Sequence, residues 1–250
     1  MNVYLDDQGD GPTVVMVHGL GGSANTFEAQ ANALARSYRL IRPDLPGSAR
    51  STSALPQSLE ALADQLVEQL SEIAPHAHWV GHSMGAAICQ WVAAKYPERV
   101  TSLALINPFY EAPPPVKETL TQRALRVRAQ GMAEFSDEYL GVALAPESAT
   151  GQPSARAYLR ESLHGTAPET YAAYCDLLAA HKAPDLSSLH MRTMIVTGDR
   201  DTIAPLALTE RMRASLSLAT LSVLPACGHW SPLEAPYELT ALLREHFEMR

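Results

Sequence analysis

The sequence has little cysteine, a shortage of basic charge and no long apolar run, and each shortage excludes a class of protein. Three cysteines, Cys89, Cys175 and Cys227, cannot all pair, and they show no metal-site spacing. Lysine and arginine number 19 against 27 aspartates and glutamates, and the net charge of −8 argues against a nucleic-acid partner. No apolar stretch is long enough to span a bilayer. We therefore expect reduced thiols and neither a metal site nor a membrane partner.

The composition that remains is typical of one globular domain. Apolar residues make up 46% of the chain and charged residues 18%, which favours a folded chain over disorder. A length of 250 residues suits one core with an insert. The opening residues MNVYLDDQGDGP lack the basic and then apolar pattern of a secretory signal. Together with the unpaired cysteines, this predicts a cytoplasmic protein.

Short apolar runs alternate with helical patterns along much of the chain. Leu59, Leu62, Leu66, Leu70 and Ile73 mark one side of an amphipathic helix. Such βαβ alternation predicts a parallel sheet with helices on both faces. The predicted strands are residues 13–19, 38–47, 76–81, 100–108, 191–199 and 218–228.

The pattern changes at the proline-rich stretch NPFYEAPPPVKE, residues 107–118. From about residue 117 to 182 the chain is predicted to form three or four helices and no strand. A helical stretch between two strands of one sheet is most simply an insertion on one edge of the core. We therefore expect core residues 1–109, a helical cap over 110–190 and further core residues 191–250.

A serine lies between two glycines, Gly81-His82-Ser83-Met84-Gly85, where a predicted strand meets a predicted helix. G-x-S-x-G at such a junction is typical of a nucleophile elbow, a tight turn that projects the serine hydroxyl clear of the sheet. Small flanking residues are needed there, because larger side chains would collide with neighbouring strands. The following helix directs N–H groups and its positive dipole end to the same point. We predict Ser83 as a nucleophile.

A serine nucleophile needs a base, and the sequence offers one far along the chain. His229 lies in the loop after the last predicted strand, and Asp199 and Asp201 follow the strand before it. Loops at the carboxyl ends of parallel strands converge on one edge of a sheet. Of the two acids, Asp201 is preferred by its motif position, because Asp199 comes straight off the strand and suits a turn. Ser83, Asp201 and His229 are the predicted catalytic triad.

The stretch VHGLGGS, residues 17–23, can supply the donors that such a serine requires. Its glycines end a strand and can turn backbone N–H groups toward the serine. We assign the oxyanion donors to the backbone N–H groups of Leu20 and Met84. His18 is expected to support this loop rather than to react.

Three further side chains are candidates for contact with a substrate. Trp230 follows the predicted base and would either line the acyl pocket or pack the loop. Arg126 and Arg128 in the cap could hold a substrate carboxylate, because guanidinium pairs with carboxylate in a two-pronged fashion. The alternative is that both arginines are solvated helix positions, and that alternative is preferred.

The motifs HGLGG, GHSMG, GDRD-x-x-x-P and GHW-x-x-x-E-x-P occur in this order, and the whole chain resembles the α/β-hydrolase superfamily. The resemblance implies an eight-stranded, mostly parallel sheet with helices on both faces and a helical cap after the sixth strand. Within the superfamily the chain resembles 3-oxoadipate enol-lactonases, through HGLGG and the cap phrases RVRAQGMAEF and TAPETYAAYCDLLAAHK.

That resemblance implies a serine esterase or lactonase that cleaves a small, carboxylate-bearing substrate through an acyl-enzyme, without a cofactor. Two alternatives stay open. The phrase CGHW resembles carbon–carbon hydrolases of meta-cleavage products, although their glycine-proline oxyanion motif is absent. Some proteins of this fold instead bind a small ligand as receptors. The expected partner is a small molecule in each case, and the oligomeric state is left open.

Overall fold

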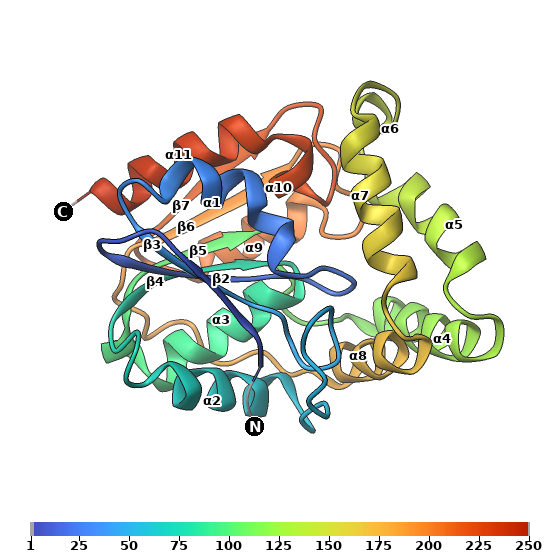
Figure 1. Cartoon of the computed structure of the whole chain (residues 1–250), viewed down its shortest axis with the longest axis horizontal. Helices are drawn as coiled ribbons and strands as arrows, with labels where there is room; N and C mark the ends of the chain where they lie inside the picture. The colour runs from blue at the N-terminus through green and yellow to red at the C-terminus, as the bar shows by residue number, and fades with distance from the viewer. Residues whose placement is uncertain (1–2, 250) are drawn as a thin grey trace.

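The structure, a computed structural model that describes residues 3–249, is built on a seven-stranded sheet (Figure 1). The strand order is β1-β3-β2-β4-β5-β6-β7, and neighbouring strands are parallel except for β1 and β3. The strands are β1 (Leu5–Gln8), β2 (Thr13–Val17), β3 (Arg39–Pro43), β4 (Ala77–His82), β5 (Val100–Ile106), β6 (Thr193–Gly198) and β7 (Ala219–Leu224).

The expected α/β-hydrolase sheet of eight strands is wrong by one strand. All six strands predicted from apolar runs are present, and β1 is the addition. Its sequence LDDQ is polar and lies at the sheet edge, so it carried no apolar signal. Within residues 3–249, β1 is the single strand before β2, and Gly9 and Gly11, at φ 80° and 120°, form the link between them. The helical insert consequently follows the fifth strand, not the sixth.

Strand alternation divides the apolar side chains into two cores. On β2, Val14 and Met16 point to one face while Val15 and Val17 point to the other. The first face packs against α1 and α11, and the second packs against α2, α3 and the insert, as Figure 1 shows. Both faces are therefore covered, as continuous apolar strands require.

The helices of the core begin and end at ordinary signals. Ser58 caps α2 by accepting a hydrogen bond from the Ala61 N–H at 3.0 Å. The predicted apolar stripe ends at Leu70, and Ile73 lies beyond α2 and is exposed. The core helices are η1 (Ala24–Phe27), α1 (Glu28–Leu34), α2 (Leu59–Leu70), α3 (Met84–Lys95), η2 (Pro97–Arg99), α9 (Leu206–Ala214), α10 (Ser231–Glu234) and α11 (Pro236–Glu248).

Five helices between β5 and β6 form one group beside the sheet, at the right in Figure 1, and are called the cap below. The sequence predicted three or four. Proline begins four of the five, at Pro114, Pro146, Pro153 and Pro168, because its fixed φ suits a first helical turn and interrupts a preceding one. The cap helices are α4 (Pro114–Gln130), α5 (Ala133–Ala143), α6 (Pro146–Gly151), α7 (Pro153–His164) and α8 (Pro168–Ala180).

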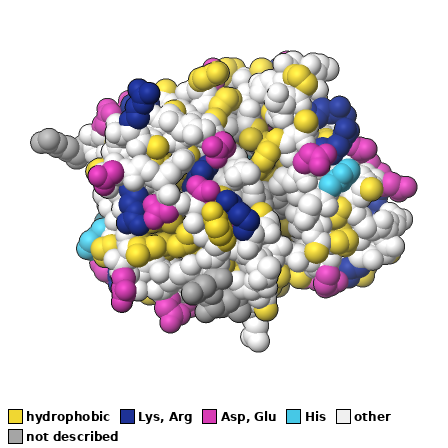
Figure 2. Space-filling model, in the orientation of Figure 1, with side chains coloured by type: hydrophobic (Ala, Val, Ile, Leu, Met, Phe, Trp, Pro, Cys, Tyr) yellow, Lys and Arg dark blue, Asp and Glu magenta, His cyan; other side chains and the backbone are white. Residues whose placement is uncertain are grey.

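The cap is hydrogen-bonded to the loops that follow β2 and β3. The Ser162 hydroxyl donates to the Gly21 carbonyl at 2.7 Å, and the Tyr174 hydroxyl donates to the Pro46 carbonyl at 2.9 Å. On the face seen in Figure 2, charged side chains of both signs are interspersed. None of the helices in residues 3–249 combines the length and apolar character needed to cross a bilayer.

Candidate active site

Ser83 lies in a strained turn between β4 and α3. Its backbone has φ 52° and ψ −114°, in the region of positive φ that residues other than glycine rarely adopt. The turn is held because the Ser83 N–H donates to the Ile106 carbonyl at 2.9 Å, while its carbonyl accepts from the Ala86 N–H at 2.9 Å. Ser83 is half-buried although its neighbours His82 and Met84 are buried, so its side chain is accessible.

Glycines allow this turn to form against the sheet. A Cβ atom at Gly85 would overlap the carbonyl oxygen of Val17, and one at Gly81 would overlap the backbone of Gly85. A Cβ at Gly19 would lie 3.0 Å from the Cβ of Ser83. The loop that follows β2 therefore passes directly beside the serine.

The structure brings the three predicted side chains together. Ser83 Oγ lies 2.9 Å from His229 Nε2, and His229 Nδ1 lies 2.9 Å from Asp201 Oδ2. His229 and Asp201 are 2% and 6% exposed. With Nδ1–H donating to the carboxylate, Nε2 is left as the acceptor for the serine hydroxyl, which is the tautomer that a general base requires.

Asp201 is held in its charged form by its surroundings. Burial alone would raise its pKa, but the nearby His229 and hydrogen bonds lower the pKa of Asp201 to about 2. The Ile203 and Ala204 N–H groups donate to Oδ1 at 2.9 and 2.8 Å, and Asn107 Nδ2 donates to Oδ2 at 2.9 Å. The second acid, Asp199, instead accepts from the Cys227 N–H at 3.3 Å, and within residues 3–249 it forms no hydrogen bond or ion pair with His229.

Two backbone N–H groups beside the serine are unused. The turn from Gly19 to Gly22 is closed by one hydrogen bond of 3.1 Å, with Gly21 at φ 75°. Within residues 3–249, neither the Leu20 N–H nor the Met84 N–H donates to another group of the chain. Met84 is the first residue of α3, where N–H groups have no partner within the helix.

Two buried histidines support these loops. His18 Nδ1 contacts the Gly19 carbonyl at 2.8 Å and its Nε2 accepts from the Leu45 N–H at 3.0 Å. His82 Nε2 donates to the His229 carbonyl at 2.7 Å. Burial lowers the pKa of His82 to about 3, so it remains neutral beside His229. His18 therefore has the supporting position that the sequence suggested.

The three candidate substrate contacts have other partners. Trp230 is 1% exposed and packs on His82, with ring centroids 4.9 Å apart. Arg126 forms two 2.6 Å hydrogen bonds with Glu138, and Arg128 pairs with two carboxylates of α8, Glu169 and Asp176. Both guanidinium groups are thus engaged on the cap surface by the cap's own carboxylates.

Sequence reasoning missed two residues that hold the site. Asn107, at φ 44° after β5, donates to Asp201 and also to the Gly228 carbonyl at 3.1 Å. Asparagine tolerates positive φ better than most residues, which was the available signal. Glu234, 5% exposed, accepts from the Gly228 N–H at 3.0 Å and the Trp230 N–H at 2.9 Å. Its place in the GHW-x-x-x-E motif was visible, but its role was not.

The end of α5 is tied to the loop of His229. The His229 N–H donates to the Ala143 carbonyl at 2.8 Å, and the Ala145 N–H donates to Glu234 at 2.8 Å. The Thr202 hydroxyl, beside Asp201, donates to the Val142 carbonyl at 2.9 Å. The cap is therefore hydrogen-bonded to both loops that carry the acid and the base.

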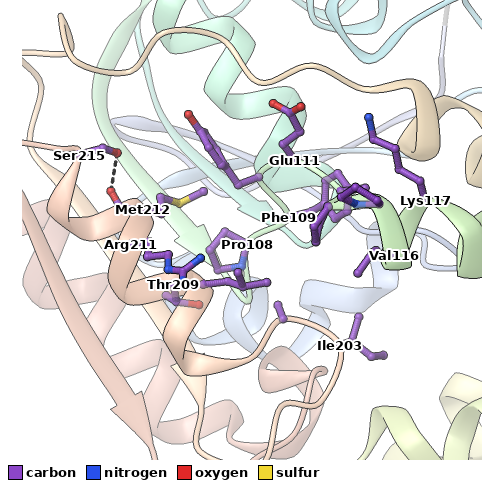
Figure 3. Close-up of a pocket in the computed structure, with 16 residues that line it drawn as sticks. Pro108, Phe109, Glu111, Val116, Lys117, Ile203, Thr209, Arg211, Met212 and Ser215 are labelled. Carbon is purple, nitrogen blue, oxygen red and sulfur yellow. Dashed lines mark hydrogen bonds between the residues drawn. The ribbon is translucent and has the colours of Figure 1, made fainter.

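A cavity of about 580 Å³ lies between the segment that follows β5 and helix α9 (Figure 3). Its wall is largely apolar, and Glu111, Lys117 and Arg211 supply its charged groups. Ile203 and Ala204, which hold Asp201, form part of the wall, but none of the three side chains of the serine site does. This cavity is adjacent to the acid loop and separate from the serine.

The cysteines are unpaired, and the metal-ligating side chains of the described residues are dispersed. All three cysteines are buried and have free thiols. Among the residues that the structure describes, no group of three or more histidine, cysteine, aspartate or glutamate side chains could hold a metal ion.

Comparison with known proteins gives consistent matches over nearly the full length. The family model described as alpha/beta hydrolase fold matches residues 12–236. The pimeloyl-(acyl-carrier protein) methyl ester esterase of Chromobacterium violaceum is 30% identical over 99% of both chains. The 3-oxoadipate enol-lactonase 2 of Acinetobacter baylyi is 26% identical over 94% of this chain and 88% of its own. A thermophilic esterase from Thermogutta terrifontis, solved with malate bound, superposes with TM-score 0.92 at 27% identity, over 98% of this chain and 92% of its own.

Proposed function

Because the chain belongs to the α/β-hydrolase family and is a hydrolase of that fold, we propose that it cleaves an ester or lactone of a small, carboxylate-bearing substrate through an acyl-enzyme on Ser83. The observation that carries this proposal is the pair of 2.9 Å contacts from Ser83 to His229 and from His229 to Asp201. A linked hydroxyl, imidazole and buried carboxylate form the arrangement that activates a serine.

In the first half of the reaction, Ser83 Oγ attacks the substrate carbonyl while His229 Nε2 takes its proton. Asp201 fixes the ring tautomer and stabilises the imidazolium that forms. The free N–H groups of Leu20 and Met84 would bind the developing oxyanion, each stabilising it by on the order of 3 kcal/mol. His229 then protonates the departing alcohol oxygen, which breaks the ester bond and leaves the acyl group on Ser83.

In the second half, His229 activates water against the acyl-enzyme. The proton passes from water to Nε2 and then to Ser83 Oγ as the acid is released. We propose that residues 110–190 act as a cap domain over this step, excluding bulk water from the acyl-enzyme. The hydrogen bonds of Ala143 and Val142 to the His229 and Asp201 loops support a cap position close to the reaction.

A carboxylate-bearing substrate is supported by what the similar proteins are named for. Pimeloyl, 3-oxoadipate and malate, which appear in the names of the two relatives and the solved esterase, are all units derived from dicarboxylic acids. These names support a small acyl substrate that carries a second acidic group.

The proposal is tested by comparing the purified protein with Ser83→Ala on p-nitrophenyl acetate. We expect steady turnover by the wild type and a loss of at least about a thousandfold in kcat for the variant. Equal rates in the two proteins would overturn the hydrolase proposal. A single burst without sustained release would instead support a small-ligand receptor.

A second comparison separates ester from carbon–carbon cleavage. The wild type is offered an enol-lactone and a vinylogous diketo acid under the same conditions. We expect hydrolysis of the lactone, because the oxyanion loop is the short HGLGG type. Efficient cleavage of the diketo acid alone would establish the carbon–carbon hydrolase alternative.

A further inference from the structure

Arg123, on cap helix α4, differs from the other two arginines of that helix. Arg126 and Arg128 project to the surface and are engaged by carboxylates. No aspartate or glutamate in residues 3–249 forms an ion pair with Arg123. It is a cation without an anionic partner in the described chain.

The helical repeat explains why Arg123 turns inward. Leu120, Ala124 and Val127 form the buried stripe of α4, and Arg123 falls on the same face, three residues after Leu120. Helix α4 packs against α8 along this stripe. Arg126 lies well outside this stripe, whereas Arg128, four residues after Ala124, borders its other edge and pairs with carboxylates of α8.

Aromatic rings surround the Arg123 side chain. Its guanidinium carbon lies 5.6 Å from the ring centroid of Phe135 and 5.4 Å from that of Tyr139, both on α5. Burial acts to lower the pKa of Arg123, but Tyr171, Tyr139 and Cys175 act in the other direction and the pKa is raised. The guanidinium is therefore charged and lies between α5 and α8.

Buried aromatic rings connect Arg123 with the loop that follows β2. Tyr171 packs against the oxyanion loop, since a Cβ at Gly21 would lie 3.4 Å from its ring. Burial raises the pKa of Tyr139 to about 12, so its hydroxyl is neutral, and the ring of Tyr171 packs on that of Phe135 with centroids 5.0 Å apart. Tyr139 and Tyr171 are both buried. The rings of Phe135 and Tyr171 thus connect Arg123 with the loop that contains Gly21.

We propose that Arg123 binds a distal carboxylate on the acyl part of the substrate, so that the enzyme selects monoesters or lactones of dicarboxylic acids. Arg123 is half-buried and has no anionic partner within residues 3–249, and a carboxylate satisfies the guanidinium fork with two charge-assisted hydrogen bonds. The tyrosine hydroxyls of residues 139 and 171 can donate to the same carboxylate. This inference rests on the proposed ester or lactone hydrolysis at Ser83.

The test uses two esters of equal chain length, p-nitrophenyl hexanoate and the mono-p-nitrophenyl ester of adipic acid, which differ in a terminal methyl or carboxylate. For Arg123→Gln we expect kcat/KM on the adipate ester to fall by about 10–100-fold, mainly through KM, with hexanoate within about threefold of wild type. Arg123→Lys, which keeps the charge but loses the fork, is expected to be intermediate. Arg156→Gln removes an exposed cap cation and should change neither ester.

Free adipate provides a second measurement. It is expected to inhibit hexanoate hydrolysis by the wild type competitively, and to lose this effect in Arg123→Gln. Noncompetitive inhibition would overturn the proposal by placing the anion in the outer groove of about 300 Å³ between α4 and α5, which Arg123 also lines.

The outcomes separate this inference from the proposed function. The wild type can hydrolyse the hexanoate ester in a Ser83-dependent manner while Arg123→Gln lowers kcat/KM for both esters equally, or for neither ester. In that case the carboxylate assignment is wrong and the proposed hydrolysis stands. If neither ester is cleaved in a Ser83-dependent manner, the proposed function itself fails. Retained hexanoate turnover shows that the variant is folded.

Discussion

At the scale of single residues, two strained positions carry the polar groups of the site. Ser83 after β4 and Asn107 after β5 both have positive φ, at 52° and 44°. Each is held by a backbone hydrogen bond: the Ser83 N–H donates to the Ile106 carbonyl, and the Asn107 N–H donates to the Val196 carbonyl. Backbone strain of this kind persists where the surrounding structure fixes it, and it often marks functional positions. Here the adjacent strands β4 and β5 place Ser83 close to Asn107, the residue that donates a hydrogen bond to Asp201.

Asn107→Ala should reduce kcat by about 10–100-fold with little change in KM. The variant loses a 2.9 Å hydrogen bond to the charged Asp201, and hydrogen bonds to charged groups contribute about 1.5–3 kcal/mol. The measurement is steady-state hydrolysis of p-nitrophenyl acetate. Asn107→Gly is the control, because glycine accepts positive φ but lacks the amide. Wild-type kcat in Asn107→Gly would show that backbone conformation, not the hydrogen bond, explains any loss in Asn107→Ala.

At the scale of elements, the close approach of α3 to β2 positions the serine. Gly85 in the first turn of α3 lies against the Val17 carbonyl with no space for a side chain. Helix α3 is buried along most of its length, so it cannot shift outward easily. The same contact brings the start of α3, with the free Met84 N–H, beside the turn of residues 19–22.

Gly85→Ala and Gly141→Ala should therefore change stability in opposite directions. At Gly85 the added methyl must displace β2 or α3, and such overpacking typically lowers the free energy of unfolding by about 1–3 kcal/mol. At Gly141, an exposed position of α5, a Cβ meets nothing within 4 Å, and alanine is expected to stabilise the helix by about 0.5–1 kcal/mol. Urea unfolding measures both. A Gly85→Ala protein as stable as wild type would contradict the close packing.

The elements that the sequence predicted share strong local signals. Five of the six predicted strands were visible because they are largely buried within the sheet, and β7, a partly exposed edge strand, was visible through its apolar residues. Strand β1 was missed because it is a polar edge strand. The convergence of Ser83, Asp201 and His229 follows from loops at one sheet edge, so it could be anticipated. The inward turn of Arg123 depends on which face of α4 meets α8, and the hydrogen bonds of Asn107 depend on a backbone angle. Neither packing nor angle is readable from composition alone.

At the scale of the whole molecule, several histidines are buried in neutral form. Burial lowers the pKa of His82 to about 3 and that of His78, His181 and His246 to about 4, and it also lowers that of His18. In the unfolded chain each titrates near 6.5. Between about pH 6.5 and 4 the unfolded state therefore binds more protons than the folded state.

The free energy of unfolding should fall as pH decreases from 6.5 toward 4. Each buried histidine contributes a slope of up to about 1.4 kcal/mol per pH unit in that window. Asp201 acts later, because its pKa is lowered from 3.8 to about 2 and its stabilisation is lost only below about pH 4. Urea unfolding at a series of pH values measures the slope, and His246→Gln should make it shallower. Constant stability from pH 7 to 4.5 would contradict neutral burial.

The most direct test of the account is the site and rate of phosphonylation by a p-nitrophenyl alkylphosphonate. The reagent should release one p-nitrophenol per chain and leave its phosphonyl group on Ser83, as peptide mass mapping would show. In His229→Ala we predict labelling slower by about a thousandfold, because the base that takes the serine proton is absent. A phosphonyl group on another residue, or an unchanged rate in His229→Ala, would contradict the claim that His229 activates Ser83.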